Sequence, residues 1–319
     1  MADRTYLVTG AMGCIGAWTL YHLVKQGERV VSFDLQERGH RVDLLLSEED
    51  KKKVTFVSGD LTNFENVNNT FKEHKITHVI HLAALQVPFC RANPILGAQV
   101  NVVGTVNIFE AAKANGVSHM AQASSVAVFG PPSMYPPGLL ANDAPHAPTN
   151  LYGVYKVADE GIAKIYWQDA KISSAGLRPY TVYGVGRDQG MTSDPTKAML
   201  AAMAGQPFHI NFGGKQQLQW ASDTAQQFIE IATKPRDGAN IYNMGGVITA
   251  IADVVALIKQ VKPDAQVTMN ETPLNLPDGF DDSELRKHFT VYETPFEQGA
   301  RQTMEAFRSY LAQGRIKVN

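Results

Sequence analysis

The N-terminal segment has the order of a βαβ unit, and this feature limits the possible fold more than any other. Residues 5–9 are apolar enough for a buried strand, and three glycines follow between positions 10 and 16. Apolar spacing predicts a helix over residues 15–26, and a second strand is predicted over residues 30–33. Because a helical crossover joins parallel strands, the segment predicts a parallel sheet.

The same alternation continues through the first half of the chain. Further strands are predicted at 54–57, 77–82, 120–123 and 172–177, and helices at 64–74, 95–115 and 150–170. Strands that alternate with helices predict an α/β fold, here a Rossmann-like doubly wound parallel sheet. The proline-rich stretch 131–148 predicts an ordered surface loop or lid.

The second half predicts a smaller lobe that is interleaved with the first. The pattern is less regular over residues 184–214. Regular patterns then return as a helix at 221–233, a strand at 240–243 and helices at 251–261 and 296–313. We therefore expect a larger domain that covers residues 1–180 with about 218–245. A smaller lobe is expected to cover residues 181–217 with 246–319.

Composition narrows the possible partners. The 319 residues include 29 Lys and Arg against 31 Asp and Glu, a net charge of −2, so nucleic acid is not an expected partner. Cys14 and Cys90 are too few for a disulfide framework or a thiolate zinc site, and they favour a reducing compartment, which we take to be the cytoplasm. Without a signal-peptide pattern or a run of about eighteen apolar residues, we expect no membrane partner. We also expect no metal, because no histidine pair has metalloenzyme spacing.

The glycine loop is suited to bind a dinucleotide. Its amide groups lie between a strand and the start of a helix, where they and the helix dipole attract a pyrophosphate. The loop residues expected to contact the cofactor are Gly10, Met12, Gly13, Cys14, Ile15 and Gly16. Taken alone, the glycines are also compatible with a tight turn that binds nothing.

Two aspartates support the dinucleotide interpretation. Asp34 ends the second strand, where its carboxylate can accept hydrogen bonds from the adenosine ribose and repel a 2′-phosphate, which favours NAD over NADP. Arg38 and Arg41 follow closely and keep NADP as the alternative, because an arginine can neutralise that phosphate. Asp60 follows the third strand and is expected to meet the adenine, to cap the next helix, or both.

Tyr152 and Lys156 are a candidate proton-transfer pair. Four residues apart in a predicted helix, they share one face, so the Lys156 ammonium favours the ionised form of the Tyr152 phenol. A serine pair, Ser124 and Ser125, follows a predicted strand earlier in the chain. An ionisable phenol beside a hydroxyl is suited to acid–base chemistry at an alcohol or ketone.

These features occur in a fixed order along the chain. The stretches are TGAMGCIG, Asp34, Gly59-Asp60-Leu61, His81-Leu82-Ala83-Ala84, Asn101, Ser124 to Gly130, Tyr152 with Lys156, and Leu177-Arg178-Pro179. In this order they resemble the extended short-chain dehydrogenase/reductase superfamily, in particular its NAD-dependent epimerase/dehydratase branch with the UDP-glucose 4-epimerase-like proteins. The resemblance covers nearly the whole chain.

The resemblance implies a mechanism and a set of contacts. Tyr152 is expected to be the catalytic acid/base, Lys156 to hold the nicotinamide ribose, and Ser125 to hydrogen-bond the reacting oxygen while hydride passes between NAD and a secondary alcohol. Further NAD contacts are implied for Leu35, Leu61, Leu82, Ala83, Ala84, Asn101, Pro179 and Tyr180. Relatives commonly dimerise through the helices that correspond to 95–115 and 150–170, so a homodimer is expected.

The chain departs from the UDP-sugar enzymes of this family. Thr181 stands where they carry an asparagine, Gln216 stands where they carry an arginine for the diphosphate, and residues 271–284 contain no basic residue. We therefore expect an oxidoreductase for a small carbohydrate, namely a sugar, sugar acid or polyol. Its expected contacts are Gln86, Arg91, Ser125, Thr181 and Arg187.

Two alternatives stay open. A UDP-sugar 4-epimerase that holds NAD tightly would exchange sugar isomers without net formation of NADH, whereas a dehydrogenase would form NADH. A redox-sensing binding protein would keep the cofactor fold without catalysis, but the complete set of Ser125, Tyr152 and Lys156 argues against it.

Overall fold

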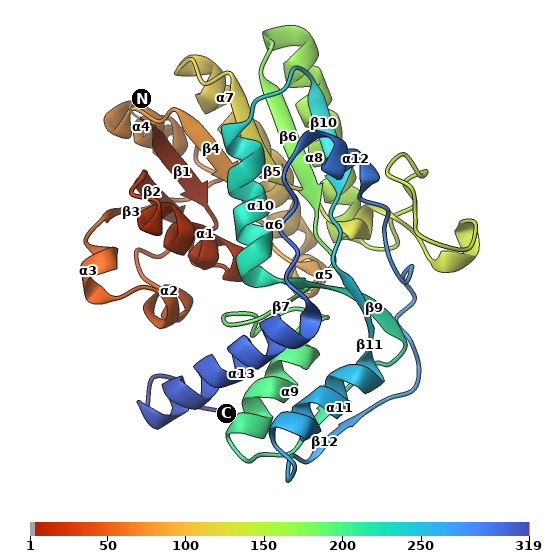
Figure 1. Cartoon of the computed structure of the whole chain (residues 1–319). Helices are drawn as coiled ribbons and strands as arrows, with labels where there is room; N and C mark the ends of the chain where they lie inside the picture. The colour runs from red at the N-terminus through yellow and green to blue at the C-terminus, as the bar shows by residue number, and fades with distance from the viewer. Residues whose placement is uncertain (1–3, 319) are drawn as a thin grey trace.

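The computed structural model describes residues 4–318, which form a large and a small lobe (Figure 1). The large lobe is built on a seven-stranded sheet in the order β10-β6-β5-β4-β1-β2-β3, and every neighbouring pair is parallel. Its strands are β1 (Thr5–Thr9), β2 (Arg29–Asp34), β3 (Val54–Ser58), β4 (His78–His81), β5 (His119–Ala123), β6 (Ser173–Arg178) and β10 (Ala239–Asn243). The expected doubly wound parallel sheet is confirmed.

The strand order reverses beside β1. The strands that follow β1 directly, β2 and β3, lie on one side of it, whereas β4, β5 and β6 lie on the other. The loops after β1 and β4 therefore lead away in opposite directions. In parallel sheets such a reversal opens a crevice at the carboxyl ends of the strands, where ligands bind.

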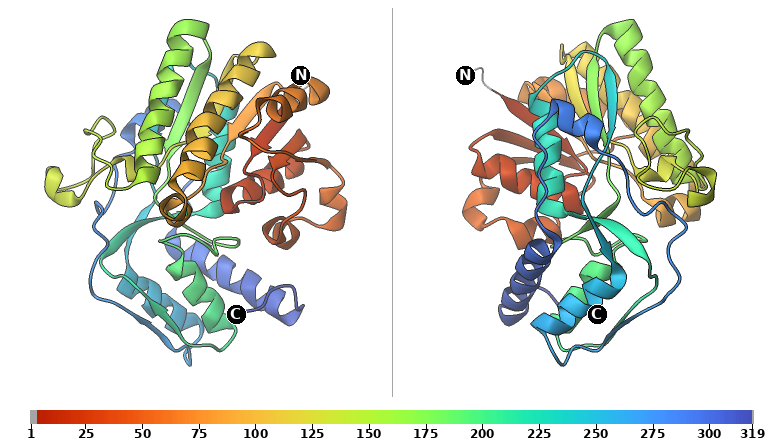
Figure 2. Two further views of the ribbon diagram at one scale, coloured as in Figure 1. Left: turned by 180° about the vertical axis from the view of Figure 1, so that it is seen from behind. Right: turned by 45° about the vertical axis from the view of Figure 1, so that its right-hand side comes forward.

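Helices cover both faces of this sheet, as Figure 1 and the view from behind in Figure 2 show. One face carries α1 (Cys14–Lys25) and α10 (Ala221–Thr233), which pack against each other over a core that includes Leu20 and Phe228. The other face carries α4 (Phe64–His74), α7 (Gly104–Ala114) and α8 (Leu151–Ala170). The crossover between β2 and β3 contains α2 (His40–Leu45) and α3 (Glu48–Lys51), which the sequence pattern did not predict.

The helix expected over 95–115 is divided. After α5 (Val87–Ala92) come α6 (Pro94–Ala98), a π-helical turn (Gln99–Val103) and α7. The continuous helical segment Pro94–Ala114 is long and apolar enough to span a membrane, and its most apolar 18-residue window has a mean hydropathy of 1.2. The sequence pattern predicted no such segment. The segment packs against α4 and α8, and 44% of its most apolar 18-residue window is buried.

The small lobe has its own core and its own short sheets. A three-stranded sheet in the order β11-β9-β7 and a two-stranded parallel pair pack with three helices around buried Met199, Phe212 and Ile258. Its elements are β7 (Thr181–Tyr183), α9 (Asp194–Met203), β8 (Phe208–Ile210), β9 (Lys215–Trp220), β11 (Val247–Ala250), α11 (Ile251–Val261), β12 (Val267–Met269) and α13 (Phe296–Ala312). The segment expected to be irregular thus contains α9.

The chain crosses between the lobes repeatedly. It returns to the large lobe at Ala221, where α10 begins directly after β9. It leaves again after β10, and α12 (Ser283–His288) comes back to pack on β10. The stretch 131–148 contains no regular helix beyond a 3-10 turn, and Leu140 within it bridges to Phe280.

Candidate functional site

A cleft runs along the carboxyl ends of the parallel strands. Its first half is lined by the loops after β1 to β4, and its second half by residues after β5, by α8 and by the segment after β7. Both halves share Ile15, Leu82, Ala84, Gln86, Ala123 and Arg187, so they are one continuous space. The first half takes in most of the expected cofactor contacts: Gly10, Gly13, Cys14, Ile15, Gly16, Asp34, Leu35, Asp60, Leu61, Leu82, Ala83 and Ala84.

The glycine loop is shaped by close backbone approaches. Gly10 has a φ of +66°, and a Cβ there would lie 2.7 Å from the backbone of Ala83. A Cβ on Gly16 would lie 2.2 Å from the carbonyl oxygen of Gly10. Helix α1 begins after Gly13 without a side-chain cap and without an acidic residue in its first turn. Its first amides and its dipole therefore face the cleft free to bind an anion, as a pyrophosphate requires.

Asp34 is held in place beside this loop. Its carboxylate accepts hydrogen bonds from the amides of Met12, at 3.0 Å, and Leu35, at 2.8 Å. Burial raises the pKa of Asp34, and these amides and Arg41 oppose that rise. Arg41 is itself bound to Asp188 and to the carbonyl of Met12, so its guanidinium already has partners.

Asp60 also lines the cleft, and one expected role for it is wrong. Its Oδ1 accepts hydrogen bonds from the amide and the hydroxyl of Thr62, both at 2.8 Å. The residue that caps α4 is Asn63, whose side chain accepts from the amide of Asn66. Asp60 therefore shapes its own loop at the edge of the cleft instead of capping the helix.

Lys156 is enclosed beneath Tyr152. Its Nζ lies 6.0 Å from the centroid of the Tyr152 ring and donates to the carbonyl of Ala123, at 2.8 Å, and to Asp159 Oδ2, at 3.1 Å. Burial acts to lower the pKa of Lys156, but the charges of Asp159 and Tyr152 outweigh it and the pKa is raised. Lys156 is therefore a cation at neutral pH, directly below a partly exposed phenol.

The start of α8 brings Tyr152 next to the serine pair. Asn150 caps the helix by accepting from the amide of Gly153. A Cβ on Gly153 would lie 2.1 Å from the carbonyl oxygen of Ala127, so only glycine allows the first turn of α8 to pack on this backbone. Tyr152, Ser125 and Lys156 consequently line the same half of the cleft.

The two serines have different surroundings. Ser124 is buried and donates to Glu160 Oε1 at 2.5 Å. Ser125 is partly exposed, and its hydroxyl accepts from the amide of Ala127 at 3.2 Å. Of the two hydroxyls, that of Ser125 is therefore the one available to a ligand.

A buried ionic cluster behind the serines was missed by the sequence reasoning. Glu160 binds Arg178 through two hydrogen bonds of 2.8 Å, and His146 lies 3.2 Å from the same carboxylate. Burial would raise the pKa of Glu160, but hydrogen bonds from Arg178, His146 and Ser124 lower it to about 2. Glu160 follows Lys156 by four residues, so helical spacing could have indicated that it lies on the same face.

Comparison with known proteins identifies the chain. Residues 6–245 match the model of the NAD dependent epimerase/dehydratase family. The chain belongs to this family. The expected family and its NAD cofactor are thereby confirmed, and the amides of α1, the glycine loop and Asp34 are the groups that fit NAD.

Relatives in the family are known as UDP-sugar epimerases. A UDP-glucose 4-epimerase of Mycolicibacterium smegmatis is 31% identical over 256 residues, which cover 78% of this chain and 79% of the relative. A UDP-glucuronate 4-epimerase 5 of Arabidopsis thaliana is 34% identical over 185 residues, which cover 56% of this chain and 42% of the relative.

Solved structures agree on the fold. The UDP-glucose 4-epimerase of Thermus thermophilus, crystallised with NAD, has a TM-score of 0.81 and 25% identity over 96% of this chain and 99% of that one. The L-threonine dehydrogenase of Clostridium difficile has a TM-score of 0.82 over 99% of this chain and 100% of that one, at 20% identity. The fold is thus shared with proteins named for different reactions.

Several expected contacts of this family member lie away from the cleft. Asn101 is fully buried in the π-helical turn, where its side chain binds both the amide and the carbonyl of Leu85, so it supports the wall of the cleft from behind. Met12 is buried and meets Asp34 only through its amide. Arg91 is exposed on α5. None of these three side chains lines the cleft.

Thr181 also lies outside the cleft. It is fully buried in β7, and its hydroxyl donates to Gln216 Oε1 at 2.9 Å. Thr181 and Gln216, two of the positions at which the chain is expected to depart from the UDP-sugar enzymes, are thus bound to each other. Pro179 and Tyr180 line the second half of the cleft together with Gln86 and Arg187.

His81 is enclosed by structure. Its ring nitrogens lie 2.7 Å from the hydroxyl of Thr9 and 3.1 Å from that of Thr105, and burial lowers its pKa to about 3. Within residues 4–318, no group of three or more His, Cys, Asp and Glu side chains is arranged to hold a metal ion.

Proposed function

We propose that this family member moves hydride between NAD and a secondary alcohol of a small sugar, sugar acid or polyol. The observation that supports this is the position of Ser125, Tyr152 and Lys156 in one half of a cleft whose other half is formed by the glycine loop. A proton-transfer group and a dinucleotide cradle thus open into the same space.

The side chains have distinct tasks in this reaction. Tyr152 as phenolate removes the proton of the substrate hydroxyl, and Ser125 donates a hydrogen bond to the same oxygen as negative charge develops on it. The Lys156 ammonium, held by Ala123 and Asp159, stabilises the phenolate. NAD, when bound, accepts the hydride.

The charges in the second half of the cleft favour a substrate without a nucleotide. Of the residues that line it, only Lys156 and Arg187 are basic, and Lys156 is bound to Asp159. Gln216, which replaces a family arginine, is buried and accepts from Thr181. Because each lost charge-assisted contact to a phosphate weakens binding by about 1.5–3 kcal/mol, a UDP-sugar would bind weakly.

A UDP-sugar 4-epimerase is the second candidate. The names of the relatives at 31% and 34% identity favour it. Such an enzyme would return the hydride to the other face of the same carbon and release no NADH.

A screen by NADH absorbance tests the proposal. The purified protein with NAD is offered free sugars, uronates, aldonates, polyols and UDP-sugars, and sugar isomers are separated by chromatography. We expect NADH to accumulate with a substrate that has no nucleotide. Isomer exchange of a UDP-sugar without accumulation of NADH would refute the proposal in favour of the epimerase.

We further propose that the protein is a homodimer in the cytoplasm. Large apolar side chains are exposed on the segment Pro94–Ala114 and on α8, namely Ile95, Leu96, Val103, Leu151, Val154 and Ile165. Pairing these helices with those of a second copy would remove this surface from water. Sedimentation of the native protein and of Val154→Lys tests this, and a monomeric native protein would refute it.

A further inference from the structure

Arg187 carries a charge that the residues around it leave without a counter-charge. It follows β7 in the small lobe, and its side chain lines both halves of the cleft. Nη2 donates to the hydroxyl of Thr192 at 3.2 Å, whereas Nε is shut off from solvent and has no hydrogen-bond partner within residues 4–318. Arg187 is only half-buried, but a guanidinium that is partly removed from water and has one neutral partner is favoured when a ligand supplies an anion.

The neighbouring carboxylate is already engaged. Asp188 binds Arg41 and His40, each at 2.5 Å, so it holds the loop to α2 and does not pair with Arg187. Within the described residues no other carboxylate forms an ion pair with Arg187. Burial lowers the pKa of Arg187, and the charge of Asp188 only partly opposes this.

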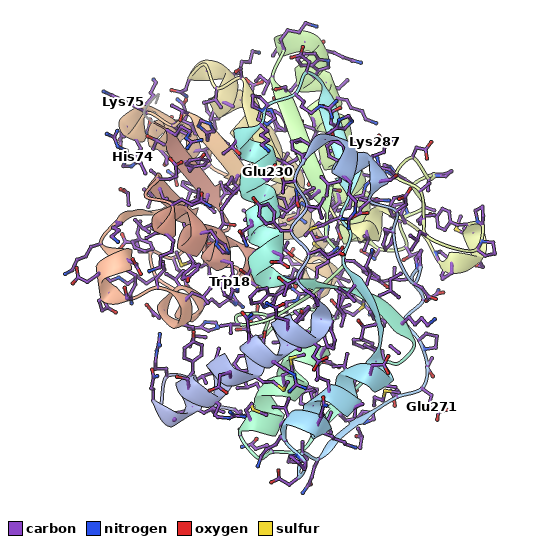
Figure 3. The ribbon with its side chains drawn as sticks, viewed as in Figure 1. Trp18, His74, Lys75, Glu230, Glu271 and Lys287 are labelled. Atoms are coloured by element: carbon purple, nitrogen blue, oxygen red, sulfur yellow. The ribbon has the colours of Figure 1, made fainter. Side chains whose placement is uncertain are left out.

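The segment before Arg187 is fastened to the start of α1. The carbonyl oxygen of Val185 accepts from Trp18 Nε1 at 2.9 Å and lies 3.8 Å from Cys14 Sγ. Figure 3 shows Trp18 where α1 meets the small lobe. Arg187 lines one half of the cleft together with Cys14, Ile15 and Gly16, at the uncapped N-terminus of α1, and the other half together with Tyr152.

We propose that Arg187 binds the pyrophosphate of NAD opposite the amides of α1. A single anion at this point would serve two groups, the first amides of α1, which have no cap, and the Arg187 guanidinium, which has no counter-charge. A planar guanidinium also matches phosphate oxygens in a two-point contact. The expected role of Arg187 as a substrate contact is replaced by this one, and the proposal needs only the NAD dependence of the family, whatever the substrate.

The assignment has a consequence for the two lobes. The glycine loop belongs to the large lobe and Arg187 to the small lobe, so the pyrophosphate joins them. NAD binding should therefore stabilise the small lobe against unfolding.

Titration calorimetry with three ligands tests the proposal. NAD and ADP-ribose contain the pyrophosphate, and adenosine does not. We expect Arg187→Gln to weaken the binding of NAD and of ADP-ribose by about ten- to a hundred-fold and to leave adenosine within two-fold. Arg187→Lys should lose less affinity for NAD and ADP-ribose, because lysine keeps the positive charge but cannot make the two-point contact. Arg301→Gln, which changes an exposed arginine on α13 that does not line the cleft, is the matched control and should bind all three ligands normally.

Two results would overturn the proposal. One is unchanged affinity for NAD and ADP-ribose in Arg187→Gln, above all with a raised KM for the substrate, which would make Arg187 a substrate anchor. The other is a loss of adenosine affinity, in both Arg187 variants, that equals the loss of NAD affinity. This would mean that Arg187 has a structural role. If Arg187→Gln does not fold, Arg187→Lys decides, because unchanged NAD affinity in that variant contradicts a two-point contact.

Discussion

Lys156 donates a hydrogen bond to Asp159, and both side chains are almost fully enclosed, with exposed fractions of 2% and 3%. Burial raises the pKa of Asp159, and Lys156 opposes the rise. Asp159 Oδ1 has no hydrogen-bond partner within residues 4–318. The carboxylate holds Lys156 in place, and it also offsets part of the positive field that Lys156 exerts on Tyr152.

We therefore expect Asp159→Asn to shift the pH dependence of alcohol oxidation. Glu160 is bound to Arg178, His81 is neutral and the Cys90 thiol is protonated because burial raises its pKa, so Asp159 is the charge that changes. Without the negative charge of Asp159 the Tyr152 phenolate is favoured. The pH at which the oxidation rate is half-maximal should therefore fall by roughly one unit.

The control is Asp169→Asn, which removes an exposed charge from the same helix and should leave the profile unchanged. A profile of Asp159→Asn that overlays the native one would contradict this role. Folding of both variants is checked by circular dichroism.

Tyr152→Phe should separate binding from chemistry. Removing the hydroxyl leaves the glycine loop, Asp34 and Lys156 intact, so NAD affinity should stay within a few-fold. Turnover should fall by about 10²–10⁴-fold, because the proton of the substrate alcohol loses its acceptor. Calorimetry and NADH absorbance measure the two effects, and unchanged turnover would remove Tyr152 from the mechanism.

Asp34→Ala should relax the choice of cofactor. Asp34 lines the first half of the cleft, and removing its carboxylate removes the repulsion of a 2′-phosphate. The efficiency with NADP should therefore rise relative to that with NAD. The ratio of kcat/KM for the two cofactors measures this. Glu37→Gln, an exposed acid three residues later, is the matched control. A variant as selective for NAD as the native protein would show that Asp34 does not discriminate.

Glu160 should contribute stability that is lost in acid. Its pKa in the folded protein is about 2, below the ordinary value of 4.5, so its contribution is complete above pH 4.5 and disappears as pH falls towards 2. Each unit of this shift corresponds to about 1.4 kcal/mol, so Glu160→Gln should cost roughly 3 kcal/mol at pH 7.

Thermal unfolding at several pH values measures this contribution. The difference in unfolding free energy between native protein and Glu160→Gln should shrink below pH 4.5, whereas Glu73→Gln, at an exposed position, should match the native protein throughout. A constant difference between pH 7 and pH 2 would mean that the ionised carboxylate is not the source. His81, with a lowered pKa, destabilises all three proteins alike on acidification below about 6.5.

The sequence pattern was informative where periodicity and local chemistry agree. The unit β1-α1-β2, the glycine loop and Asp34 follow from short-range signals and lie as predicted. Helix α9 was not predicted because most of its residues are buried, among them Ala198, Met199 and Ala202. It therefore lacks the polar face that makes a helical period visible in a sequence. Helices α2 and α3 are too short to show a period.

The residues that were expected at the site but do not line the cleft have a feature in common. Arg91, Thr181 and Asn101 lie close in sequence to residues that line the cleft, but which way each side chain faces is fixed by tertiary packing. Asn101 sits in a π-helical turn, which sequence spacing at 3.6 residues per turn does not reveal. The pair of Thr181 and Gln216 joins two strands that are 35 residues apart.

The interleaved path of the chain constrains how the molecule can be divided. A cut after Tyr180 would separate α10, β10 and α12 from the rest of the large lobe. These elements belong to the large lobe but come from the C-terminal half of the chain. Because the described chain crosses between the lobes more than once, neither half should fold when it is expressed as a separate fragment. Protease nicks at surface loops should leave the pieces associated until the whole protein melts.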